Sequence, residues 1–225
     1  LRPASNDVHF AVMTSGYNSV TNGFLLESLK MVLRFIDKDE IQMIHYPDFF
    51  EEGYKHKYDK DIYHYLDSVA RDDQYQMDRG FCHRLLRCSV VIWQFKNINE
   101  LIEKYNEVIN VLENSYDGEP NTSDIQQLKG MIREFEEELV WAYNGVLVKN
   151  VHHLHLGFYQ DKGITKGPNM ERDVMPILNQ FREIQPDIIS VTLDPEGSGP
   201  DTHYKVLQAT AAAVAEWSKE KDLSN

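Results

Sequence analysis

The sequence predicts an α/β fold in which a mostly parallel sheet is covered by helices and interrupted by a large helical insertion. An apolar, β-branched run over residues 8–14 ends in Ser15-Gly16, which is typical of a buried strand followed by a turn. A long middle section then spaces its apolar residues as helices do. After residue 145 the pattern runs strand, helix, strand, helix, which favours a right-handed crossover and parallel strands.

Composition narrows the class of protein. A chain of 225 residues with 42% hydrophobic content is long enough for one domain with a sizeable core. Its 36 acidic residues outnumber 23 basic ones, so nucleic acid and anionic membranes are not expected partners. No apolar run approaches the roughly 18 residues that a membrane-spanning helix needs. The two cysteines, Cys82 and Cys88, form no disulfide framework; we expect packed thiols and a cytoplasmic location.

The first half of the chain is predicted to be largely helical after its first strand. A helix is expected from Gly23, with one apolar face that comprises Leu25, Leu26, Leu29, Val32, Leu33 and Ile36. Several helices should follow over residues 60–145, interrupted near Gly80, at 96–99 and at 115–124. Residues 122–124 offer caps for the last of them.

The second half supplies the remaining elements of the predicted sheet. VHHLHLGF, residues 151–158, predicts a strand, and residues 167–185 predict a helix with Pro168 near its start. Residues 187–193 predict a strand buried on both faces, and a closing helix should begin near Asp201. Ligands of open parallel sheets bind beyond the carboxyl ends of the strands. The loops at 14–17, 157–161 and 194–203 are therefore the candidate site.

His203 is the most informative residue of these loops. Asp201 or Thr202 can cap the last helix, which places His203 in its first turn. The positive end of the helix dipole disfavours an imidazolium there, and a metal ion requires a neutral imidazole. A solvent-facing histidine that caps its own helix is the alternative.

Three further histidines lie on the strand predicted over residues 151–158. Because side chains alternate along a strand, His153 and His155 share one face while His152 points to the other. No cysteine or third ligand accompanies the pair at a spacing typical of zinc, so a structural role is favoured. The chain also contains no glycine-rich phosphate loop and no Gly-x-Ser-x-Gly motif.

The ordered segments MTSG, IREFEEELVWAYNGV, VHHLHLGFYQD and QPDIISVTLDPEGSGPDTHYKVLQA resemble a known family. They are similar to the PIG-L or LmbE family of metal-dependent N-deacetylases. The closer resemblance is to the form fused to glucosamine-6-phosphate deaminase-like proteins of Bacteroides-type bacteria. It covers residues 8–22 and 128–217, and it implies one Rossmann-like domain over residues 1–225 with a helical insertion at 24–127.

The resemblance implies roles for individual residues. The family's Arg-x-x-Glu pattern is matched by Arg133 and Glu136, and its late His-Pro-Asp-His motif by residues 199–203. His203 then corresponds to a ligand of zinc or another divalent metal, and Asp201 to a catalytic position, while Gly199 replaces the first histidine. The implied substrate-binding residues are Thr14, Ser15, Gly16, Arg133, Tyr159 and Asp161.

One motif of the family, His-Pro-Asp-Asp, has no counterpart in the 225 residues. It supplies two metal ligands and the general base, and a catalytic zinc needs about three protein ligands. We expect this motif upstream of Leu1, on a first strand and helix that this chain lacks, so the chain alone should be inactive. A degenerate relative is the alternative.

The function expected from this resemblance is zinc-dependent hydrolysis of an acetamido group on a small amino-sugar derivative. A covalently joined deaminase-type domain and a homo-oligomer are the expected partners. The alternative function is that of a non-catalytic module that scaffolds or regulates a sugar-phosphate deaminase or isomerase domain.

Overall fold

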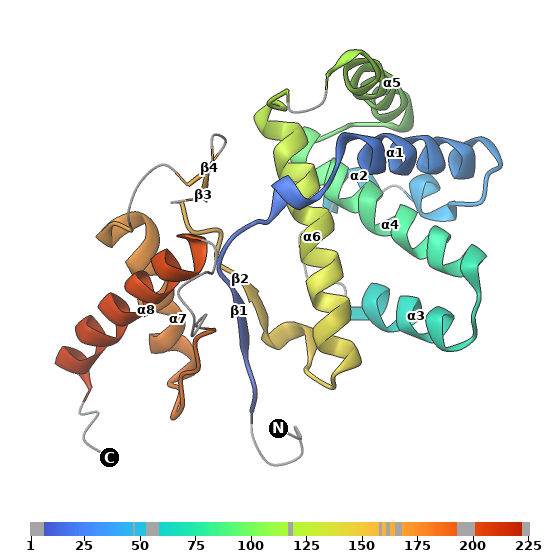
Figure 1. Ribbon diagram of the computed structural model, residues 1–225. Helices are drawn as coiled ribbons and strands as arrows, with labels where there is room; N and C mark the ends of the chain where they lie inside the picture. Colours follow the sequence, from blue (N-terminus) through green and yellow to red (C-terminus); the bar gives the residue numbers. More distant parts are fainter. Residues whose placement is uncertain are drawn as a thin grey trace. The chain divides into compact units, whose positions relative to one another are not determined.

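The computed structural model describes residues 7–46, 48–52, 59–116, 119–157, 159–160, 163–164, 168–192 and 201–221. The chain divides into two compact units. We call residues 1–10 and 16–152 the helical unit, and residues 11–15 and 153–225 the C-terminal unit. Helices dominate the described residues of both (Figure 1).

The helical unit is built from helices that pack around a large apolar core and a smaller cluster of Ile62, Phe135 and Val148. The helices are η1 (Tyr17–Ser19), α1 (Asn22–Asp37), η2 (Gln42–His45), α2 (Phe49–Glu52), α3 (Asp59–Ala70), α4 (Gln74–Trp93), α5 (Ile98–Asn114), α6 (Ser123–Tyr143) and η3 (Val148–Asn150). α1 packs against α4 and α5, and α4 packs against α3 and α6 (Figure 1). The predicted apolar face of α1 is confirmed, since Leu25, Leu29 and Val32 are fully buried.

Helix boundaries follow the predicted signals in most places. The breaks at 96–99 and 115–124 are confirmed, because α5 begins at Ile98 and α6 at Ser123. Thr122 is the N-cap of α6, although its side chain makes no cap hydrogen bond. The interruption expected at Gly80 is wrong, since α4 continues through it. Tyr65 of α3 lies 3.4 Å from where a Cβ of Gly80 would be, which is an ordinary van der Waals distance.

In the described residues, the predicted parallel sheet consists of two strands. β1 (Phe10–Val12) pairs with β2 (Val151–His153), and both lie in runs that the sequence predicts to be strands of a parallel sheet. The Leu154 N–H donates to the Val12 carbonyl over 2.9 Å, and the Leu156 N–H donates to that of Met13 over 2.7 Å. The regular pairing is therefore shorter than the apolar runs that predict it.

The C-terminal unit packs two helices face to face. η4 (Met170–Val174) is a π-helical turn that leads into α7 (Met175–Ile184), and α8 (Asp201–Glu220) closes the chain. Their core comprises Val174, Ile177, Leu178, Phe181, Ala209, Ala213 and Trp217 together with Leu156. A short hairpin joins β3 (Tyr159–Gln160) to β4 (Gly163–Ile164) in antiparallel register.

The strand predicted over residues 187–193 is wrong for its described part, 187–192. These residues have no strand assignment, and the Ile188 side chain is 84% exposed. A strand needs neighbouring backbone to pair with, and the described residues offer none to this segment. A mixed, mostly helical structure with a small parallel sheet is what the described residues show.

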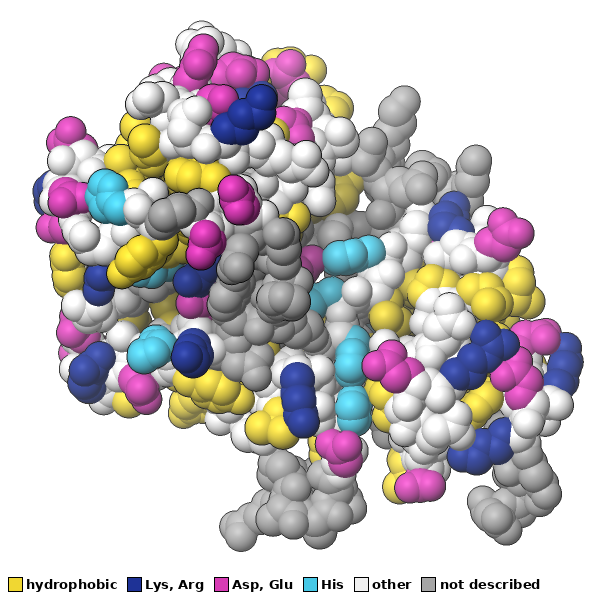
Figure 2. Space-filling view, turned by 180° about the vertical axis from the view of Figure 1, so that it is seen from behind, with side chains coloured by type: hydrophobic (Ala, Val, Ile, Leu, Met, Phe, Trp, Pro, Cys, Tyr) yellow, Lys and Arg dark blue, Asp and Glu magenta, His cyan; other side chains and the backbone are white. Residues whose placement is uncertain are grey.

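Three features predicted from the composition can be compared with the structure: membrane-spanning helices, surface charge and the cysteines. No helix in the described part of the chain is long and apolar enough to cross a membrane. The face drawn in Figure 2 intersperses acidic side chains with basic ones. Cys82 and Cys88 are buried in α4, as predicted, and burial raises the pKa of their thiols to about 12 and about 11.

Candidate functional site

The loop after β1 brings one of the predicted substrate-binding residues against another. Gly16 adopts a left-handed conformation, with φ of 63°, directly before η1. A Cβ at this position would lie 3.6 Å from Cγ of Arg133, which α6 carries. Gly16 and Arg133 therefore lie close together in the helical unit. Thr14 and Ser15 belong to the C-terminal unit.

Arg133 is engaged by acids of its own helix. Its Nη1 donates to Oε2 of Glu136, and its Nη2 donates to Oε1 of Glu137 over 3.2 Å. Residues three and four positions apart face each other on a helix, which explains both contacts. The Arg-x-x-Glu pattern thus forms an ion pair. The two acids fix the direction of the guanidinium beside Gly16.

Replacing Gly16 by alanine is expected to destabilise the helical unit by about 1–2 kcal/mol, because a left-handed backbone brings Cβ too close to the following carbonyl. Gly23→Ala is the matched control. No atom lies within 4 Å of its Cβ position, and alanine suits a helix better than glycine. Amide hydrogen exchange of α1 and α6 measures both changes. Equal exchange in the two variants would show that the Gly16 conformation carries no strain.

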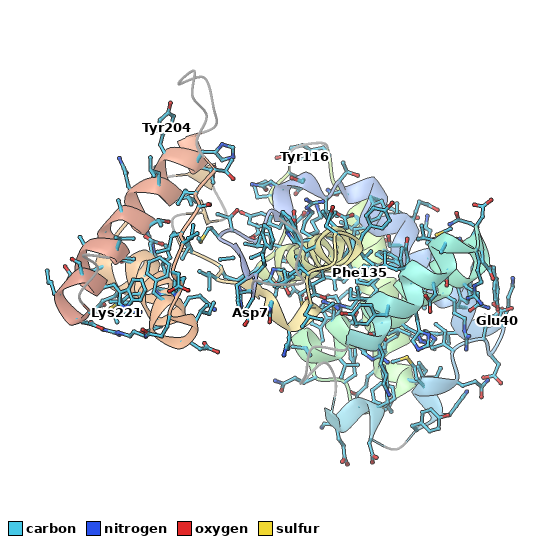
Figure 3. The ribbon with its side chains drawn as sticks, turned by 90° about the horizontal axis from the view of Figure 1, so that it is seen from below. Asp7, Glu40, Tyr116, Phe135, Tyr204 and Lys221 are labelled. Atoms are coloured by element: carbon cyan, nitrogen blue, oxygen red, sulfur yellow. The ribbon has the colours of Figure 1, made fainter. Side chains whose placement is uncertain are left out.

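His203 lies in the first turn of α8, as the sequence predicts. α8 begins at Asp201, and Tyr204, labelled in Figure 3, follows His203 near that end of the helix. The His203 Nδ1 atom is buried and has no hydrogen-bond partner in the structure. A buried ring nitrogen without a partner costs free energy, so this atom is suited to a ligand that the structure does not contain.

Four predicted positions lie partly or wholly outside the described residues. The backbone of Tyr159 belongs to β3 and that of Asp201 to α8, and their side chains are not described. Asp161 and Gly199 lie outside the described residues altogether.

The two histidines of β2 each lie beside another histidine. In the helical unit, His9 Nδ1 lies 2.9 Å from His152 Nε2, and His9 Nε2 lies 3.3 Å from Asp7 Oδ2. Hydrogen bonds from His9 and then Asn150 lower the pKa of Asp7 below its ordinary value. In the C-terminal unit, the rings of His153 and His155 are stacked with their centres 6.4 Å apart, although β2 ends at His153 and His155 has a positive φ.

A catalytic zinc ion needs more than His203. Among the described residues, no group of three or more histidine, cysteine, aspartate or glutamate side chains is arranged to hold a metal. The unpartnered Nδ1 atom of His203 fits a metal ligand, and the described residues supply no second and third donor around it.

Sequence reasoning missed a charged cluster in the C-terminal unit. Arg172 and Asp173 form an ion pair at the start of η4, and the Arg172 side chain lies against the backbone of Gly157. Gly157 belongs to the loop predicted to bind ligand. The available signal was Asn169, a helix-capping residue that is followed four positions later by Asp173.

Comparison with known proteins gives one informative similarity. The chain is 36% identical over 138 residues to a protein of Bacteroides thetaiotaomicron described as glucosamine-6-phosphate deaminase-like. The match covers 56% of this chain and 20% of that protein, so the chain spans a fifth of its relative's length. No protein-family model matches the chain. No solved structure matches it at a significant level.

Proposed function

We propose that this chain is part of a zinc-dependent N-deacetylase-like domain that hydrolyses an acetamido group on an amino-sugar derivative. It would act within a longer glucosamine-6-phosphate deaminase-like protein. The similarity to the Bacteroides thetaiotaomicron protein supports the amino-sugar class. The observation that carries the metal assignment is the buried, unpartnered Nδ1 atom of His203 in the first turn of α8.

The proposal gives each predicted residue a task. His203 would be one zinc ligand, and we assign the other ligands to parts of the longer protein. When bound, zinc would polarise the acetamido carbonyl and acidify a water molecule. Asp201 would act on protons at the reacting group, and the remaining predicted residues would position the sugar. They are Thr14, Ser15, Gly16, Arg133, Tyr159 and Asp161.

Replacing His203 by alanine in the longer protein is expected to reduce bound zinc from about one equivalent to a small fraction. Loss of a residue that merely orients a ligand costs about 10–100-fold, so a direct ligand should cost more than 100-fold in acetate release. His45→Ala is the matched control, because His45 is exposed and bonded to Asp39 over 2.6 Å. Elemental analysis and an acetate assay measure the two quantities.

Two results would contradict the proposal. Full zinc occupancy in His203→Ala would remove the ligand assignment. A wild-type protein that releases no acetate from N-acetylated amino sugars, with zinc supplied, would exclude the deacetylase. Deamination that nevertheless required this segment would then favour a non-catalytic module that supports a neighbouring deaminase domain.

A further inference from the structure

Two imidazoles face each other at the paired strands, within the helical unit. His9 directly precedes β1, and His152 is the middle residue of β2. The His9 Nδ1 atom lies 2.9 Å from the His152 Nε2 atom, although the two residues are 143 positions apart in the sequence. The His9 side chain is 22% exposed, so a small ion can reach it from solvent. Imidazole nitrogens are the commonest protein ligands of metal ions.

The separation of the two nitrogens suits two ligands of one metal ion. A bond from a metal ion to an imidazole nitrogen is about 2.0–2.1 Å long. Two such bonds at a right angle hold their nitrogens about 2.8–3.0 Å apart, and two at a tetrahedral angle about 3.3–3.4 Å. The observed 2.9 Å matches the right angle, which neighbouring ligands make in square-planar Cu(II) and Ni(II) sites. A proton can also link the two rings, so a metal ion and a proton compete for this place.

Asp7 orients the His9 ring for this contact. Its Oδ2 atom lies 3.3 Å from His9 Nε2, and a carboxylate can only accept there. His9 Nε2 therefore carries the proton, and His9 Nδ1 presents its lone pair toward His152. The Asn150 side chain holds the aspartate, since its Nδ2 donates to Asp7 Oδ1 over 2.8 Å and to the Val8 carbonyl over 3.1 Å. A carboxylate that accepts from the second nitrogen of a histidine is the usual companion of a metal-binding imidazole.

A metal ion at this place would join two distant parts of the chain. β1 and β2 contain three residues each, and a pair of short strands is only marginally stable by itself. Because the two histidines are 143 positions apart, an ion bound to both closes a long loop. Links that close long loops are expected to stabilise a fold the most.

We infer that His9 and His152 bind a divalent transition-metal ion that clips β1 to β2, with Asp7 as the positioning residue of His9. Two imidazoles suit copper, nickel or zinc rather than magnesium or calcium. No third histidine, cysteine, aspartate or glutamate joins the pair in the described part of the chain, so water completes the coordination. The inference is independent of the proposed function, because His203 takes no part in it.

Titration of the longer protein with Cu²⁺, followed by electron paramagnetic resonance, tests the two ligands. The wild type should show Cu(II) coupled to two imidazole nitrogens. Asp7→Asn should weaken this site about 10–100-fold, the usual cost of losing a residue that orients a ligand, and His9→Gln or His152→Gln more than 100-fold. His45→Gln is the matched control and should change binding less than about twofold, because His45 is an exposed histidine with its own aspartate partner, Asp39.

Hydrogen exchange tests whether the ion clips the strands. An ion that binds the folded form alone, at 100 times its Kd, should slow exchange through strand separation about 100-fold. The slowing is expected at residues 10–12 and 151–154 in the wild type and in His45→Gln, but not in His9→Gln. His152→Gln serves if His9→Gln does not fold.

Three results would overturn the inference. Cu²⁺ affinities of His9→Gln and His152→Gln within twofold of the wild type would show that the two rings share only a proton. A wild-type copper signal with one coupled imidazole would exclude the pair as joint ligands. Copper bound by both histidines without slower exchange at residues 10–12 and 151–154 would exclude the clip. Acetate release by the longer protein tests the proposed function separately, since it depends on His203 and not on this pair.

Discussion

Replacing Glu138 by alanine is expected to destabilise the helical unit by about 3–5 kcal/mol, because it removes one partner of a buried ion pair. Arg84 of α4 donates from Nη1 to Oε2 of Glu138 on α6 over 2.9 Å, and each side chain is 2% exposed. The Arg84 guanidinium also lies 5.3 Å from the ring centre of Phe135, labelled among the helices in Figure 3. Denaturant dependence of amide exchange in α4 and α6 measures the change.

Two further variants test whether the buried Arg84–Glu138 ion pair is the reason for this loss of stability. Glu137→Ala removes a neighbouring acid that is 30% exposed and should cost less than about 1 kcal/mol, as surface ion pairs do. The double change Arg84→Met with Glu138→Leu should recover most of the lost stability, because an apolar pair needs no desolvation of charge. If Glu138→Ala lowers the free energy of unfolding no more than Glu137→Ala does, the ion pair between Arg84 and Glu138 does not stabilise the helical unit.

The helical unit was largely predictable from its sequence because each helix carries its own signals. Apolar residues at helical spacing bury Leu29 and Val32 on α1, and polar capping residues begin α5 at Asn97. Such signals depend on residues within a few positions of each other. Gly80 shows where they fail, since glycine is a common breaker in sequence and α4 nevertheless continues through it.

The sheet was less predictable because a strand depends on its neighbours. The run that contains Ile188 has the apolar composition of a buried strand, but its described residues form no ladder and Ile188 is exposed. The composition of a segment indicates whether its side chains can be buried. It does not indicate whether another strand is present to pair with it. The strands at β1 and β2 form because each supplies the other with backbone donors and acceptors.

The candidate site shows the same division between local and distant signals. The place of His203 in the first turn of α8 was predicted from residues adjacent to it in the sequence, although Asp201 and Thr202 belong to the helix itself. The contact of Arg133 with Gly16 joins residues more than a hundred positions apart, and it entered through the family resemblance rather than through any spacing. The Arg172–Asp173 pair was missed because adjacent residues are not expected to meet on a helix, and the π-helical turn was not foreseen.

The second large effect is expected in the C-terminal unit, where Trp217→Ala should cost about 3–5 kcal/mol. Trp217 is 3% exposed on α8, and its ring centre lies 5.4 Å from that of Phe181 on α7. Removing the indole opens a cavity in the packed core between the two helices, and large cavities cost the most free energy of unfolding. Amide exchange in α7 and α8 measures the loss of stability.

Two control variants, Trp217→Phe and Ile188→Ala, show whether the loss of stability comes from lost packing or from any substitution in this unit. The first keeps a ring against Phe181 and should lose less than half as much stability; the second removes a side chain that is 84% exposed and should change stability by less than about 0.5 kcal/mol. Because α8 carries His203 in its first turn and Trp217 near its end, Trp217→Ala should also weaken zinc binding, and Trp217→Phe should largely restore it. Unchanged exchange in α7 and α8 of Trp217→Ala would show that the indole does not hold these helices together.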